Sequence, residues 1–207
     1  MKKLVLAVAI VGLLAAQSMA QLGGIPIGMT AAPTEQGLFT VGAQGSHLSN
    51  KDIDNMNVFG GRVTYGLLDN LLLAADLGLA MPGKGKNAFA YQGLIQYNFA
   101  GLDLPFDLGA RGTVSQAKFS GENGNPDVKI LSFTGGGVVS KEVMDMLSVY
   151  GLLGLCYSKV DAGDDKNETD LAIGGGGMLT LTEQLSLYVE VAYIDDMIFG
   201  GGGTWKF

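Results

Sequence analysis

The feature that most constrains the fold is an alternation of apolar residues with polar or small ones over segments of about ten residues. In residues 57–67, Val63 and Tyr65 fall on one face of an extended strand, while Arg62 and Thr64 fall on the other. Beyond residue 20, no stretch approaches the roughly 18 consecutive apolar residues that a membrane helix needs. Since hydrocarbon admits only helices and closed barrels, the chain can enter a bilayer only as strands.

Ten segments carry this alternation and are predicted to be strands: 37–47, 57–67, 71–81, 88–99, 106–119, 130–142, 147–160, 171–181, 185–194 and 198–207. Tight turns at 68–71, 144–147 and 182–185 alternate with longer polar segments at 48–56, 82–87, 121–129 and 161–170. This asymmetry is typical of an all-β, antiparallel, up-and-down transmembrane β-barrel with turns at the periplasmic rim and loops outside. The junction at 195–197 is very short, which leaves eight strands open as an alternative.

The amino-terminal residues indicate export. Lys2 and Lys3 precede an apolar stretch and a small-residue cleavage pattern, so residues 1–20 are predicted to be a signal peptide and Gln21 the first mature residue. Residues 21–36 hold two prolines and little alternation. They are predicted to be a periplasmic leader, with a plug folded into the lumen from Leu22 to Met29 as the alternative. The barrel itself is expected to span residues 37–207.

Charged residues fall mainly on the polar face of the predicted strands, namely Arg62, Asp76, Asp107, Arg111, Glu190 and Lys206. On the apolar face, charge lies only near strand ends, where a lysine side chain can reach water. Because burial forces opposite charges to pair, the sequence predicts a lumenal charge cluster of Arg62, Asp76, Asp107, Arg111 and Glu190 that stabilises the barrel. A gate or ion-selective constriction is the functional alternative. Which carboxylate meets which arginine depends on strand stagger and stays open.

A soluble β-sandwich or lipocalin-like barrel also alternates, but its polar face meets water. Here the polar face has few charges and many glycines, which is unlike a solvated surface. Aromatic residues also gather toward strand ends on the apolar face, as in the interfacial girdles of membrane barrels. These features favour the membrane barrel.

Composition limits the remaining functions. Of the 13 lysines and arginines, two lie in the predicted signal peptide, so the mature chain has 11 basic and 20 acidic residues and a net charge of −9. An acidic surface argues against nucleic acid as a partner. The single histidine, His47, lies beside Ser46 and is interpreted as a polar loop residue rather than a general base. No catalytic, cofactor or metal site is predicted, and the acidic segment 161–170 is interpreted as a solvated loop.

The signal peptide, the hairpin turns, the paired faces and the ending Trp205-Lys206-Phe207 resemble those of small outer-membrane β-barrel proteins of Gram-negative bacteria. This group includes the OmpA-type transmembrane domain and the opacity-type adhesins, and the resemblance covers about residues 37–207. It implies a monomer in the cell outer membrane, surrounded by outer-membrane lipid. It also implies that the barrel-assembly machinery reads the last strand, with Phe199, Trp205 and Phe207 as the signal.

Two departures from the resemblance are expected: a barrel without a following periplasmic domain, and loops that are short for an adhesin. The predicted role is therefore a non-enzymatic one, structural or in surface interaction within the cell envelope. A narrow channel for ions or small solutes is the alternative.

Overall fold

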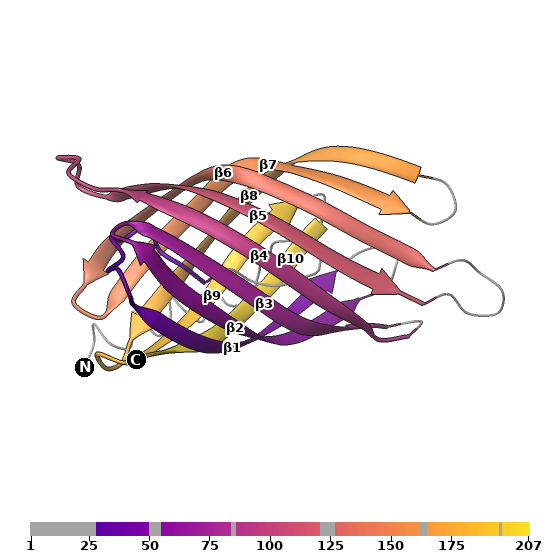
Figure 1. Cartoon of the computed structure of the whole chain (residues 1–207), viewed down its shortest axis with the longest axis horizontal. Coiled ribbons are helices and arrows are strands. Elements are labelled where there is room, and N and C mark those ends of the chain that lie inside the picture. The colour runs from indigo at the N-terminus through magenta and orange to yellow at the C-terminus, as the bar shows by residue number, and fades with distance from the viewer. Residues whose placement is uncertain (1–27, 50–54, 84–85, 121–126, 162–164, 195) are drawn as a thin grey trace.

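Ten antiparallel strands form one closed barrel in which each strand pairs with the next and β1 pairs with β10 (Figure 1). The computed structural model describes residues 28–49, 55–83, 86–120, 127–161, 165–194 and 196–207. The strands are β1 (Phe39–Ser49), β2 (Met56–Leu68), β3 (Leu71–Pro82), β4 (Ala88–Phe99), β5 (Asp107–Phe119), β6 (Val128–Met144), β7 (Leu147–Asp161), β8 (Asp165–Thr180), β9 (Leu185–Ile194) and β10 (Asp196–Lys206). The predicted all-β up-and-down barrel is confirmed.

Within the described ranges, no helix is long and apolar enough to cross a membrane. The predicted signal peptide, residues 1–20, lies outside these ranges, as do residues 21–27 of the predicted leader.

Alternation along each strand produces an apolar outer wall and a polar or small-residue lumen. The outward side chains of Phe89, Leu77 and Leu153 are 68, 60 and 60% exposed, whereas the lumen-facing Ala90 and Gln96 are fully buried. This pattern confirms the predicted assignment of residues to faces. An apolar wall of this extent would be unfavourable in water but is the ordinary surface of a barrel in hydrocarbon.

The predicted loop at 161–170 is wrong, because β7 continues to Asp161 and β8 begins at Asp165. The two strands stay paired there through Lys159↔Asn167. Polar residues on both faces hid this part of β8, since a hairpin beyond the apolar wall meets water on both sides and needs no alternation.

The alternative with eight strands is also wrong. β9 and β10 pair continuously from Ile194↔Asp196 to Leu185↔Trp205, although only residue 195 lies between them. β10 then closes the barrel against β1, through Lys206↔Thr40 at one end of the ladder.

Facing glycines let neighbouring strands approach each other on the lumen side. Gly136 of β6 lies opposite Gly154 of β7. A Cβ atom at Gly136 would collide with the carbonyl oxygen of Leu153 and lie 2.7 Å from the Cα of Gly154. The adjacent Gly135 is exposed on the outer wall, where a Cβ would meet nothing within 4 Å.

Gly136→Ala is therefore expected to lower the free energy of unfolding by about 1–3 kcal/mol, the usual effect of overpacking, while the neighbouring Gly135→Ala has little effect. Urea unfolding in lipid vesicles, followed by the fluorescence of the single tryptophan, Trp205, measures both variants. Equal effects of the two substitutions would contradict the close lumenal contact.

Candidate functional site

A buried ion pair lies in the barrel lumen between β2 and β3. Arg62 and Asp76 are register partners on these strands, and their side chains are 2% and 0% exposed. Arg62 donates from Nε to Oδ1 of Asp76 at 2.6 Å and from Nη2 to Oδ2 at 3.0 Å, which is a bidentate pair. The side-chain amides of Gln44 and Gln92 donate to the same carboxylate at 3.2 and 2.9 Å. Asp76 is thus compensated both by charge and by hydrogen bonds.

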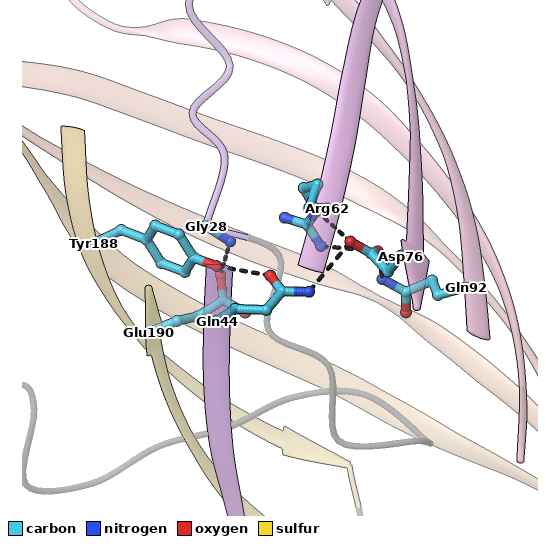
Figure 2. Close-up of polar contacts among 7 residues, drawn as sticks. All are labelled: Gly28, Gln44, Arg62, Asp76, Gln92, Tyr188 and Glu190. Atoms are coloured by element: carbon cyan, nitrogen blue, oxygen red, sulfur yellow. Dashed lines mark hydrogen bonds and ion pairs between the residues drawn. The ribbon is translucent and has the colours of Figure 1, made fainter. Parts of the chain in front are cut away.

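Gln44 links this pair to Tyr188 of β9, the strand that also carries a second buried carboxylate, Glu190 (Figure 2). The hydroxyl of Tyr188 donates to Oε1 of Gln44 at 2.8 Å. Oε2 of Glu190 accepts from the hydroxyl of Tyr150 at 2.9 Å and from the backbone amide of Gly28 at 2.7 Å. The chain before β1 therefore takes part in the lumenal network.

Among the described residues, Arg111 donates hydrogen bonds to an amide and a carbonyl oxygen rather than to a carboxylate. It donates from Nε to Oε1 of Gln96 at 2.6 Å and from Nη2 to the carbonyl oxygen of Met29 at 2.8 Å. Arg111 and Glu190 line the same small lumenal cavity, of about 10 Å³, which has room for about one water molecule. Two opposite charges thus face each other across a nearly filled space.

Residues 28–34 are called here the lumenal strap. Residues 28–31 are buried or half-buried inside the barrel, and residues 32–34 lead out to the β2–β3 turn, where the carbonyl oxygen of Thr34 accepts from the amide of Asn70. Each of the first five strap residues has a backbone group bound by a lumen side chain, at 2.7–2.9 Å: Gly28 by Glu190, Met29 by Arg111, Thr30 by Gln96, Ala31 by Ser140 and Ala32 by Asn98.

Apolar contacts also hold the strap in the lumen. Ala31 is 1% exposed and packs against Val138 and Leu152, while Met29 packs against a buried cluster that includes Leu72 and Leu94. The strap therefore fills the part of the lumen that these side chains line.

The structure places the predicted cluster residues in three groups. Arg62 pairs with Asp76, and Arg111 and Glu190 share the small cavity. Asp107 is half-buried at the start of β5 and makes no ion pair with any described residue. Lys206, also predicted on the polar face, lies 3.7 Å from Glu35 at the exposed rim.

Sequence reasoning missed the amide and phenol groups that complete the network: Gln44, Gln92, Gln96, Asn98, Tyr150 and Tyr188. The sequence feature that could have identified them is a large polar side chain at a polar-face position, where most residues are Gly, Ala, Ser or Thr. A narrow lumen leaves such side chains no water to bind, so they bind one another or the strap.

The single histidine, His47, and its neighbour Ser46 lie on opposite faces of β1. His47 lies on the outer face with Nδ1 3.0 Å from Oδ1 of Asn57, whereas Ser46 is buried on the lumen side and donates to the carbonyl oxygen of Val58 at 3.4 Å. Neighbouring residues of one strand point to opposite faces, so they cannot form a dyad. Among the described residues, no group of three His, Cys, Asp or Glu side chains is placed to hold a metal ion.

The predicted assembly residues lie on the outer wall of β10 and just after it. Phe199 and Trp205 are opposite His47 and Val41 of β1. Phe207 is 71% exposed, its amide donates to the carbonyl oxygen of Phe39 at 3.0 Å, and the two rings lie 5.9 Å apart. These contacts join β10 to β1 at the end of the barrel where the chain ends.

No protein-family model and no curated protein matches the sequence. Among solved structures, the N-terminal β-barrel domain of Pseudomonas aeruginosa OprF is similar at 14% identity, covering 84% of this chain and 100% of that one, with a TM-score of 0.42. Ail from Yersinia pestis in a phospholipid nanodisc is similar at 17% identity, covering 83% and 100%, with a TM-score of 0.44. Neisserial surface protein A is similar at 17% identity, covering 83% and 100%, with a TM-score of 0.36.

Likenesses at this level show the fold alone. Closure of all ten strands leaves no unpaired barrel edge at membrane depth, and the wall that faces outward is apolar while the lumen is polar. This architecture is that of a closed transmembrane β-barrel.

Proposed function

We propose that this protein is a non-enzymatic, non-conducting component of the outer membrane, with a structural or surface-interaction role in the cell envelope. The observation that carries this proposal is the lumenal strap. Five consecutive strap residues are held by side chains from the barrel wall. Solutes cannot pass where chain and side chains fill the lumen, and the cavity beside Arg111 has a volume of only about 10 Å³.

The polar network supports the same role. A hydrated ion pathway needs polar groups that are left free to meet water or ions, whereas Arg62 and Asp76 bind each other in a bidentate pair and are almost fully buried. Such groups stabilise the closed barrel and orient its strands.

We further propose that the barrel inserts as a monomer surrounded by outer-membrane lipid. Its last strand, with Phe199, Trp205 and Phe207, would be the segment that the barrel-assembly machinery reads. The exposed rings at the carboxyl end support this proposal.

Conductance in planar lipid bilayers tests the function. The full mature protein is expected to insert without current steps, because the strap occupies its lumen. Stable, discrete openings of the full mature protein would instead establish the narrow channel and overturn the structural role.

A further inference from the structure

β8 is longer than its neighbour β9. The first residues of β8 therefore extend beyond the described ladder with β9. β7 and β8 are paired out to Asp161↔Asp165, but the ladder between β8 and β9 begins only at Ile173↔Tyr193. Figure 1 shows the β7–β8 hairpin reaching beyond β9 and β10 at the end of the barrel opposite the carboxyl terminus. Among the described residues, 167–171 therefore have a strand neighbour on one side only.

Hydrogen bonds at the carboxyl end of β8 show which residues turn their backbone N–H and C=O groups toward β7 and which turn them toward β9. The amide of Thr180 donates to Met146, next to β7, and the amide of Leu181 donates to Leu185 of β9. Neither ladder has a register shift. Backbone groups of successive residues point to opposite sides of an antiparallel strand, so even-numbered residues of β8 face β7 and odd-numbered residues face the side of β9.

Asn167, Thr169 and Leu171 consequently present their N–H and C=O groups at the open edge. All three residues are exposed, and their backbone groups have no partner among the described residues. An exposed row of this kind is a template for a further strand.

Charge indicates which strand fits. Glu168 and Asp170 alternate with the three edge residues and project to one face of β8, on the same side as the buried Ala172. In an antiparallel pairing of two copies centred on Thr169, Glu168 of one copy would lie opposite Asp170 of the other. Like charges in that position are destabilising, so a second copy is a poor partner. A strand with lysine or arginine at alternate positions would place its cations beside these carboxylates.

We propose that the outer edge of β8, residues 167–171, binds an extended basic segment of another polypeptide by strand addition, outside the membrane. Backbone hydrogen bonds to Asn167, Thr169 and Leu171 hold the segment. Glu168 and Asp170 select its cationic side chains, and β-branched or apolar side chains of the segment alternate with these cations beside Thr169 and Leu171. The edge would then give the barrel a surface-interaction role that its sealed lumen does not supply.

Binding of a fluorescent heptapeptide of alternating lysine and valine tests the proposal, with the full mature protein in lipid nanodiscs and fluorescence anisotropy as the readout. We expect saturable binding to loaded nanodiscs and none to empty ones. The same peptide N-methylated along one backbone edge, and a peptide of alternating glutamate and valine, are each expected to bind at least roughly tenfold more weakly.

Two variants locate the contact on β8. Thr169→Pro removes an amide that points away from β7, so the hairpin keeps its ladder while the edge is blocked. The double variant Glu168→Gln and Asp170→Asn leaves the backbone intact and removes the charge. Each is expected to weaken binding by roughly tenfold, with heat-modifiable migration as the check that the barrel is closed. Absence of binding, equal binding of the N-methylated peptide, or unchanged binding by the charge variant would overturn the proposal.

Discussion

Asp76→Ala is expected to lower the free energy of unfolding by about 3–5 kcal/mol, because it leaves the Arg62 guanidinium buried without its counter-charge. The substitution also removes the acceptor of the Gln44 and Gln92 amides. The side chains of Arg62 and Asp76 cannot reach water, since they are only 2% and 0% exposed. Urea unfolding in lipid vesicles with Trp205 fluorescence measures the loss.

Asp107→Ala is the matched control, because the sequence predicts both carboxylates in the same cluster and the structure separates them. Asp107 is only half-buried and has no ion pair within the described residues, so its removal is expected to change stability by less than about 0.5 kcal/mol. A double variant, Arg62→Met with Asp76→Leu, is expected to recover most of the loss, since it removes the unpaired charge. If Asp76→Ala is as stable as Asp107→Ala, the buried pair does not stabilise the barrel.

A mature chain truncated to start at Glu35 is expected to show stable, discrete openings in planar bilayers, in contrast to the silent full-length protein. Truncation removes the whole lumenal strap and leaves polar wall groups such as Arg111, Gln96 and Asn98 facing an empty lumen. Water then replaces the backbone groups that these side chains bind. Single-channel recording at matched insertion, verified by heat-modifiable migration, gives the comparison.

Two glycine variants separate strap displacement from a general effect of mutating the amino-terminal segment. A Cβ at Gly28 would collide with the ring of Tyr188, so Gly28→Val is expected to displace the strap and produce intermittent openings. Gly37 lies outside the strap with φ +80° and nothing within 4 Å of a Cβ, and asparagine tolerates that conformation. Gly37→Asn should therefore stay silent, and a silent truncated chain would show that the strap does not seal the lumen.

The strands could be predicted because membrane strands alternate with a period of two, so that an apolar residue faces lipid at every second position. Residues 165–170 escaped prediction since they lie beyond that wall, where no apolar face is required. The lumen was harder to predict. Arg62 and Asp76 could be assigned to one face, but only the register shows that they are opposite each other.

Position along the barrel axis also could not be derived from the sequence. Asp107 shares its face with Arg111, yet it lies four residues nearer the rim and makes no ion pair with any described residue. The strap has too little alternation to predict a path. Its place became visible only through the side chains that bind it, such as Ser140 and Asn98.

The central claim, that lipid touches the outer wall of a closed barrel, is tested most directly by spin labels in lipid vesicles. Labels at Leu77→Cys and Leu153→Cys, in a Cys156→Ser background, probe the wall at two side chains that are each 60% exposed. A label at Asn167→Cys probes the hairpin beyond it. Wall labels are predicted to be accessible to oxygen and shielded from a water-soluble nickel complex, with the reverse at Asn167. Equal access of the nickel complex to all three positions would contradict the membrane barrel.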